Sequence, residues 1–295
     1  MTVSYKEIAT AKPFRFLIGD AAVEFFVHPA IVTQQSKSLE TLIHGKMKEA
    51  RDGFACIEEV DVDTFARFVE YCYTGDYPAA EHVVVLDASS IQHEDGKVEH
   101  EVGEVEHEVC EVVQNFWDLD IESSRWKAKR GKGVKKNLIM APRSMRRQEM
   151  LKAFKELSWN TPAQEPKPPQ YGARVNREAC EDYTDVFLSH ARLYVFADTY
   201  DIERLRVLSL QKLHQSLVNF TLFAERTTDI ALLLQYAYQH TPERTYTMDD
   251  LRELLMRYVC CHLEQIKSNS VFQETLKAEN SSSVDLIEML LPSLD

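Results

Sequence analysis

The sequence predicts an α+β fold, with a small sheet and short helices first and an all-helical part last. Residues 14–28, FRFLIGDAAVEFFVH, are two apolar runs around a Gly-Asp turn, the pattern of a β-hairpin. Residues 54–60, FACIEEV, are a further strand candidate. The nine glycines end at Gly172, which leaves 123 residues without one (295 minus 172) and favours helices there.

Short helices are expected between these strands. Pro29 suits the first turn of a helix, and Ser36 is placed to cap a second one that continues to about residue 44. The corner residue His28 is expected to be a partly buried imidazole that hydrogen-bonds to backbone rather than a catalytic base.

A longer helix is predicted to begin at Asp61 or Asp63. Apolar residues recur there at helical spacing, and the helix should end near Gly75, before Pro78. The apolar residues of this helix that we expect in the core are Phe65, Phe68 and Val69.

The composition changes sharply after residue 78. Residues 79–120 hold twelve acidic side chains and one basic one (1 minus 12, or −11), whereas residues 125–152 hold eleven basic and one acidic (11 minus 1, or +10). Four of the ten prolines follow between Pro162 and Pro169, as in an extended linker. We expect residues 79–182 to be a largely disordered insertion. Its acidic and basic blocks could attract each other. Alternatively, its unusual composition could reflect an error in gene prediction.

Valines repeat with alternating spacings of four and three between Val98 and Val112. This heptad pattern fits a coiled coil, and it fits equally an acidic segment that orders only with a partner. His100 and His107 each begin a His-Glu-x-x-Glu sequence, but no further ligands at metal-binding spacing accompany them, so we expect no metal.

From about residue 182 the apolar spacing predicts helices to the end. Two amphipathic helices are separated near Tyr200 and Asp201, and others are expected at 230–238 and 248–265.

Composition excludes several classes of protein. The balance of 34 basic and 47 acidic residues gives a net charge of −13, which argues against a general nucleic-acid surface. No run approaches the roughly 20 apolar residues that span a bilayer, and the first residues lack a secretory signal, so we expect an intracellular protein in the nucleus, the cytoplasm or both, without membrane contact.

Six cysteines without a C-x-x-C motif indicate neither disulfides nor zinc. Catalytic and cofactor motifs are absent, so we expect no enzyme and no cofactor.

The order of elements and several motifs resemble the BTB/POZ domain, and in particular the fungal-type BTB proteins. The residues that carry the first part of the resemblance are Phe16-Leu-Ile-Gly19, Phe26-Val-His28, Ser36, Leu39, Met47, Val60-Asp61, Thr64-Phe65 and Tyr73-Thr-Gly-Asp-Tyr77. Those that carry the second part are His190-Ala191, Tyr194, Ala197-Asp198, Tyr200, Leu205 and Leu213. The resemblance implies a tail at 1–12, a first BTB part at 13–78, the insertion at 79–182, the last BTB helices at 183–220 and a helical extension at 221–295.

This resemblance implies a protein-interaction module. A homodimer would form through Phe14, Leu17, Ile31 and Leu39, and a candidate partner surface would include Arg67, Glu70, Tyr71 and Tyr77. The expected role is an adaptor that brings an unidentified protein substrate to a cullin-3 ubiquitin ligase.

The alternative is a nuclear regulator or scaffold whose basic run directs import or contacts nucleic acid. The basic residues of this run are Lys127, Lys129, Arg130, Lys132, Lys135 and Lys136.

Overall fold

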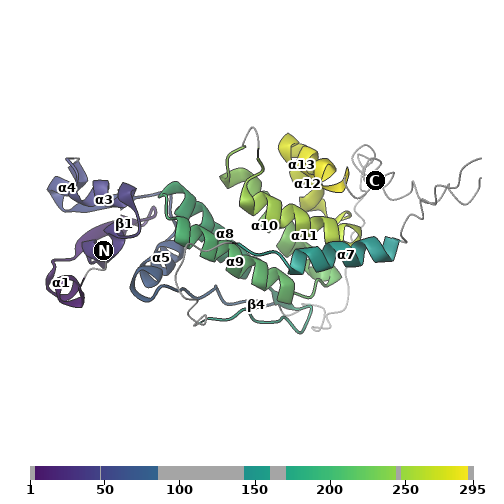
Figure 1. The fold of residues 1–295 in the computed structure, drawn as a ribbon, viewed down its shortest axis with the longest axis horizontal. Coiled ribbons are helices and arrows are strands. Elements are labelled where there is room, and N and C mark those ends of the chain that lie inside the picture. Colours follow the sequence, from purple (N-terminus) through teal and green to yellow (C-terminus); the bar gives the residue numbers. More distant parts are fainter. Residues whose placement is uncertain (1–3, 47, 86–142, 160–170, 244–246, 292–295) are drawn as a thin grey trace, which may run out of the picture.

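The structure is a computed structural model that describes residues 4–46, 48–85, 143–159, 171–243 and 247–291. The N-terminal elements lie at one end of the molecule and the last helices at the other (Figure 1). Helices α8 (Thr184–Thr199) and α9 (Glu203–Asn219) form an antiparallel pair between them. The predicted α+β class is confirmed.

A three-stranded mixed sheet forms the N-terminal end, in the order β2-β1-β3. Strand β1 (Phe14–Ile18) pairs antiparallel with β2 (Val23–Val27), as the hairpin pattern predicts, and parallel with β3 (Phe54–Ile57). Gly19 has a φ of 68°, a conformation that glycine adopts without steric cost. Its N–H donates to the carbonyl of Ile57 at 3.0 Å, so the hairpin turn is fixed to the third strand.

Five helices surround this sheet among the described residues. They are α1 (Tyr5–Thr10), α2 (Pro29–Thr33), α3 (Lys37–His44), α4 (Lys48–Asp52) and α5 (Val62–Thr74). Ser36 and Asp61 cap α3 and α5 by accepting backbone N–H groups, and Gly75 ends α5 with a φ of 81°, as predicted. Helices α1 and α4 were not predicted, although Ser4 and Glu7 form a capping box that starts α1.

The first hydrophobic cluster, here called the N-terminal core, joins both parts of the chain. Phe16 of β1 packs on Phe65 of α5, with ring centroids 5.2 Å apart. Phe196 of α8 packs on Phe68 of α5 at 4.7 Å. All four side chains are buried, so the end of α8 completes the core of a unit that began before the insertion.

The second cluster, here called the C-terminal core, is built from helices. They are α7 (Arg143–Lys155), α8, α9, α10 (Thr227–His240), α11 (Asp250–Ile266), α12 (Ser270–Ala278) and α13 (Asn280–Leu290), with a 3₁₀ turn at Ala224–Arg226. Helix α7 lies beside α11, where the rings of Phe154 and Tyr258 are 5.5 Å apart. Arg147 of α7 donates from Nε to the carbonyl of Cys261 at 3.0 Å.

Part of the segment expected to be largely disordered is ordered. Helix α7 falls within it, as does a two-stranded ribbon of β4 (Val83–Val84) and β5 (Glu181–Asp182). Strand β5 ends immediately before the helical part, which begins with α8 at Thr184. The packing of α7 was not predicted because this segment is strongly basic. The helix nevertheless packs through one buried apolar side chain, Phe154. The heptad valines, His100, His107 and the basic run 127–136 lie outside the described residues.

Candidate interaction site

The chain that leaves α5 crosses the helix pair α8 and α9. Tyr77 is completely buried, and its hydroxyl lies 2.8 Å from Nδ1 of His190 on α8. The backbone N–H of Ala80 donates to Oγ of Ser189 at 3.1 Å, also on α8. The carbonyl of Pro78 accepts from Nε of Arg67 at 3.2 Å. Residues 76–80 are therefore held between α5 and α8.

Lys212 of α9 holds the same segment from the other side. Its Nζ donates to the carbonyl of Tyr77 at 2.6 Å and forms an ion pair with the carboxylate of Asp76. The ammonium also lies 4.6 Å from the centroid of the Tyr77 ring, a cation–π contact. Burial lowers the pKa of Lys212, while the hydrogen bond and charge of Asp76 act in the opposite direction. A buried cation with this partner set fixes the path of the chain after α5.

His190 sits beneath this segment as a neutral imidazole. Burial, together with the nearby charges of Lys212 and Arg67, lowers the pKa of His190 to about 3. Its Nε2 lies 3.5 Å from Oγ of Ser216, at the long limit of a hydrogen bond. His190 is therefore a hydrogen-bonding group at physiological pH and carries no charge.

A second segment outside helices and strands, residues 171–174, borders the same space. The Tyr171 hydroxyl donates to Oε1 of Glu70 at 2.7 Å, and its N–H donates to Oδ2 of Asp76 at 3.4 Å. At the other end, Nη2 of Arg174 donates to Oε1 of Glu181 at 3.1 Å, and Nη1 lies 2.6 to 2.7 Å from the ring nitrogens of His82. The two segments are thus joined at both ends.

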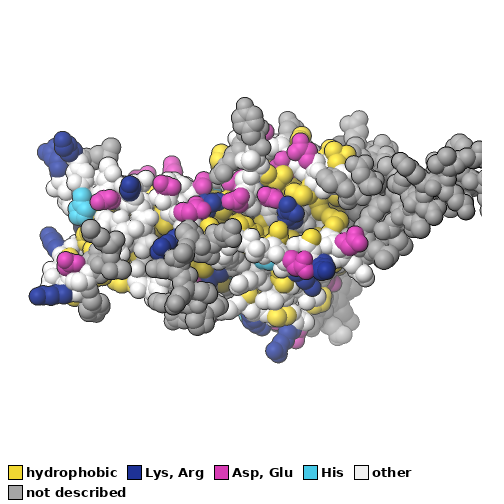
Figure 2. All heavy atoms as spheres, viewed as in Figure 1, with side chains coloured by type: hydrophobic (Ala, Val, Ile, Leu, Met, Phe, Trp, Pro, Cys, Tyr) yellow, Lys and Arg dark blue, Asp and Glu magenta, His cyan; other side chains and the backbone are white. Residues whose placement is uncertain are grey.

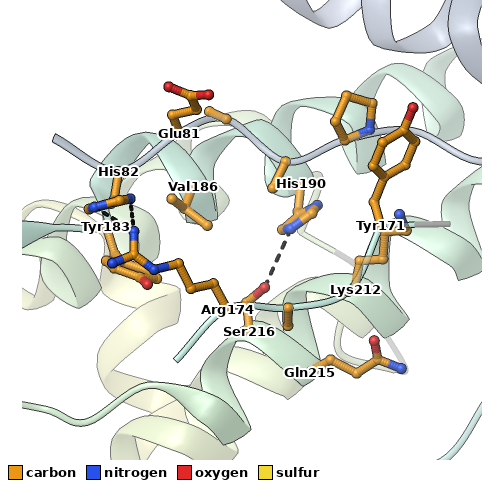
Figure 3. Close-up of a pocket in the computed structure, with 15 residues that line it drawn as sticks. Glu81, His82, Tyr171, Arg174, Tyr183, Val186, His190, Lys212, Gln215 and Ser216 are labelled. Carbon is orange, nitrogen blue, oxygen red and sulfur yellow. Dashed lines mark hydrogen bonds between the residues drawn. The ribbon is translucent and has the colours of Figure 1, made fainter. Parts of the chain in front are cut away.

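These elements enclose a cavity of about 610 Å³, here called the flank pocket (Figure 3). Residues 78–82 and 171–174 form its rim, and side chains of α8 and α9 form its floor. The Tyr183 hydroxyl is buried without a hydrogen-bond partner in the described part of the chain. Oγ of Ser216 and Nε2 of His190 share only their 3.5 Å contact. The volume lies within the range of ligand pockets.

A second cavity of about 650 Å³, here called the junction groove, lies between the N-terminal part and the C-terminal helices. One wall is the loop after β3, with Glu58 and Glu59, and the other carries Arg192 of α8 and the stacked rings of Tyr236 and His240, 4.1 Å apart. Arg192 makes no hydrogen bond or ion pair within the described residues. Acidic side chains gather where the N-terminal part meets α8 (Figure 2).

The outer face of the sheet is also partly apolar. Phe26, Arg15 and Phe54 lie directly opposite one another across β2, β1 and β3, so their side chains share a face. Phe26 is 63% exposed, the largest exposure among the large hydrophobic side chains of the described residues. Arg15 pairs with Glu24 at 3.1 Å and lies over the Phe54 ring at 4.9 Å.

The structure separates the four residues named for the dimer. Phe14, Ile31 and Leu39 are buried in the N-terminal core. Their side chains are therefore not available to a second copy in this conformation. Leu17 is half-buried on the outer face of the sheet, with Glu24 and Cys56 opposite it.

The four residues named as a partner surface do lie together, but the chain itself covers them. Tyr71 and Tyr77 are buried. Arg67 and Glu70 are half-buried and are occupied by the contacts with Pro78 and Tyr171 described above. The helix face between the core positions of α5 is therefore an internal contact and not an open surface.

His28 is half-buried at its corner as expected, but the expected backbone partner is wrong, since Nδ1 lies 2.7 Å from the Tyr73 hydroxyl. The six basic residues named for nuclear import, Lys127 to Lys136, lie outside the described residues.

Neither a metal centre nor a membrane span is found in the described residues. No group of three or more His, Cys, Asp or Glu side chains is arranged to hold a metal ion within these ranges. No described helix combines the length and apolarity needed to cross a bilayer.

The described residues of the N-terminal part form a mixed sheet backed by a helix cluster, and polar contacts fix the loop that leaves α5. The family model of the BTB/POZ domain matches residues 14–100, so the chain carries a BTB/POZ domain there. This domain mediates protein–protein interactions and is typically non-catalytic. The match ends before α8 and α9, which complete the N-terminal core. No curated protein matches the chain.

Sequence reasoning missed the residues that build the flank pocket. Lys212 and Tyr77 lie 135 positions apart, and nothing local marks their contact. The one available signal was a lysine and a histidine on otherwise apolar helix faces, at Lys212 and His190. Charged and polar residues in such places require partners, and the structure supplies them.

Proposed function

We propose that this chain is a non-enzymatic adaptor that dimerises and links a bound protein substrate to a cullin-3 ubiquitin ligase, inside the cell. The observation that carries the proposal is the shared α8. Its C-terminal half packs in the N-terminal core, and its N-terminal half packs in the C-terminal core. A helix common to both cores holds the BTB part and the helical extension as one body, which is what an adaptor needs to present two surfaces at a fixed distance.

The junction groove is the surface that we assign to the ligase. It is built from both parts of the body, and it combines half-buried apolar side chains such as Val60 and Val195 with the unpaired Arg192. Unpaired charge beside apolar surface is typical of interaction sites.

A pull-down of the purified full-length protein with cullin-3 tests this role. We expect binding by the unaltered protein and a loss of roughly tenfold in affinity for Arg192→Glu, because the charge on one wall of the groove is reversed. Arg257→Glu, at a half-buried arginine of α11 that pairs with Glu253 outside the groove, serves as a control that retains binding. Absence of cullin-3 from the pull-down of the unaltered protein removes the adaptor role.

The dimer surface that we propose is the outer face of the sheet, with Leu17 and Phe26. Light scattering on the full-length protein is expected to give twice the mass of one chain. Phe26→Asp is expected to reduce it to the mass of one chain, because an exposed aromatic side chain is replaced by a charge on both copies. A single-chain mass for the unaltered protein contradicts the dimer.

A second candidate function is a nuclear regulator or scaffold, and the density of basic residues at 127–136 in an acidic protein favours it. Deletion of residues 127–136 is then expected to abolish nuclear accumulation or salt-sensitive nucleic-acid binding. If this is the only function of the protein, neither the unaltered protein nor the deletion variant binds cullin-3.

A further inference from the structure

The floor of the flank pocket holds polar atoms whose hydrogen-bonding capacity is not used. Tyr183 is 2% exposed and its hydroxyl has no partner in the described residues. Ser216 is also buried, and its Oγ has only the 3.5 Å contact with His190 Nε2. Native proteins satisfy nearly all buried polar groups, so a buried hydroxyl without a partner and a long hydrogen bond in the same cavity indicate a bound molecule or ordered water.

The basic side chains that line this pocket already form ion pairs with acidic side chains. Lys212 is paired with Asp76, and Arg174 is paired with Glu181. Figure 3 shows the carboxylate of Glu81 directed away from the floor, where His190, Ser216 and Gln215 project from α8 and α9. A charged group on the floor would therefore lose its hydration without gaining a free counter-ion, which is costly.

The rim presents backbone as well as side chains. Residues 79–81 and 172–174 lie outside helices and strands and make no backbone–backbone hydrogen bond with other described residues, although the Ala80 N–H is occupied by Oγ of Ser189. Main-chain groups that are not used within the fold can bind a peptide by adding main-chain hydrogen bonds, while a side-chain pocket between the segments selects the sequence. The cavity of about 610 Å³ has room for several residues of such a peptide.

We propose that the flank pocket binds a short uncharged peptide segment of a partner protein, anchored by an asparagine or glutamine side chain on the pocket floor. A carboxamide both donates and accepts hydrogen bonds, so it satisfies Ser216 and His190 in either arrangement of their protons. The anchor enters between the two rim segments, where residues 79–81 and 172–174 hold the peptide backbone. This inference rests on the proposed function as an interaction module and names the class of substrate segment that the module recognises.

The test uses the full-length protein and degenerate nine-residue peptides that differ only in the fixed central residue. The central residue is Gln, Asn, Glu, Lys or Leu, and binding is measured by fluorescence anisotropy. We expect the Gln and Asn peptides to bind about tenfold more tightly than the Glu, Lys and Leu peptides, a difference typical of one unsatisfied buried group. Equal binding of all five, or a preference for Glu or Lys, overturns the proposal and leaves the pocket as a water site or a charged-ligand site.

Variants locate the binding in the pocket. Ser216→Ala removes a hydroxyl that the carboxamide contacts and is expected to abolish the preference for Gln and Asn, and Tyr183→Phe, which removes the unpartnered hydroxyl of the same cavity, is expected to weaken it. Tyr258→Phe is the matched control, since its hydroxyl is also buried without a partner among the described residues but lies on α11, away from the pocket. If Tyr258→Phe loses the preference, or Ser216→Ala and Tyr183→Phe both keep it, the site is elsewhere and the proposal fails. Thermal unfolding of each variant shows whether a loss reflects misfolding.

A cullin-3 pull-down on the same preparations separates this inference from the proposed function. Cullin-3 binding without a peptide preference disproves the peptide site alone. A peptide preference without cullin-3 binding disproves the adaptor role alone.

Discussion

The N-terminal and C-terminal cores differ in the distance along the chain over which they close. The C-terminal core is formed mainly by helices that follow one another from α8 to α13. The N-terminal core requires Phe196, far beyond the insertion, to pack on Phe68. A BTB part ending before the insertion would expose Phe65 and Phe68, so its stability depends on α8, whereas the C-terminal helices have most of their contacts within one continuous stretch.

The largest effect that tests this difference is expected from Phe196→Ala. The ring packs on Phe68, and it also lies 6.3 Å from Phe65 and 4.6 Å from Tyr200. Truncation of a buried aromatic side chain costs about 3 to 5 kcal/mol of unfolding free energy. Urea unfolding of the full-length protein measures the change. Phe26→Ala, at an exposed phenylalanine, is the control, and an equal loss in both variants would show that α8 does not complete the N-terminal core.

Lys212→Met should be the next most damaging change. It leaves the Asp76 carboxylate half-buried without this cation and the Tyr77 carbonyl without its 2.6 Å donor. Breaking a buried ion pair on one side costs roughly 3 kcal/mol. The double variant with Asp76→Asn should recover part of this loss in the same urea assay. If Asp76→Asn restores none of the lost unfolding free energy, the ion pair of Lys212 and Asp76 does not hold the chain after α5.

The pH dependence of stability tests His190. Its pKa is lowered from 6.5 to about 3 in the folded protein, so below pH 6.5 the unfolded chain binds a proton that the folded chain does not. The contribution of neutral His190 to the free energy of unfolding is therefore complete above pH 6.5 and decreases as the pH falls toward 3. Between pH 7.5 and 5 the unaltered protein should lose about 2 kcal/mol more than His190→Gln. His240→Gln, at an exposed histidine, should keep the full dependence, and a His190→Gln curve of equal slope would contradict the assignment.

Gly75→Ala should have the smallest effect. Its φ of 81° disfavours any residue with a Cβ, although no atom lies within 4 Å of the added methyl group. The expected cost is about 1 kcal/mol, from backbone strain alone. Gly172→Ala, which also has open space but no positive φ, should be neutral in thermal unfolding. Equal effects in the two variants would show that the end of α5 does not need the left-handed conformation.

The features that sequence reasoning predicted are those fixed by neighbouring residues. The hairpin depends on a turn at Gly19, and the caps of α3 and α5 depend on Ser36 and Asp61, so each carries its own local signal. Phe65 and Phe68 of α5 are buried, as helical spacing predicts, whereas Val69 is only half-buried against the N-terminal core. These signals lie within a few residues of the structure that they produce.

The candidate site could not be predicted in the same way. Its contacts join residues 76–82, residues 171–174 and two helices, and its charged pairs form between segments far apart in the chain. Tyr77 could be recognised as part of a motif, but its burial depends on Lys212 and His190. Likewise, three of the four dimer residues implied by the resemblance, Phe14, Ile31 and Leu39, are buried in the N-terminal core, because residue type alone does not show whether an apolar side chain is exposed.

A protein nicked within the insertion tests the central claim most directly. A protease site placed between residues 110 and 111 would allow the purified full-length protein to be cut after folding, and size-exclusion chromatography under native conditions would follow. Because Phe196 and Lys212 hold the earlier part of the chain by packing and ion pairing, both fragments should elute together at the position of the uncut protein. Separate elution of the two fragments would mean that the BTB part and the helices are independent bodies.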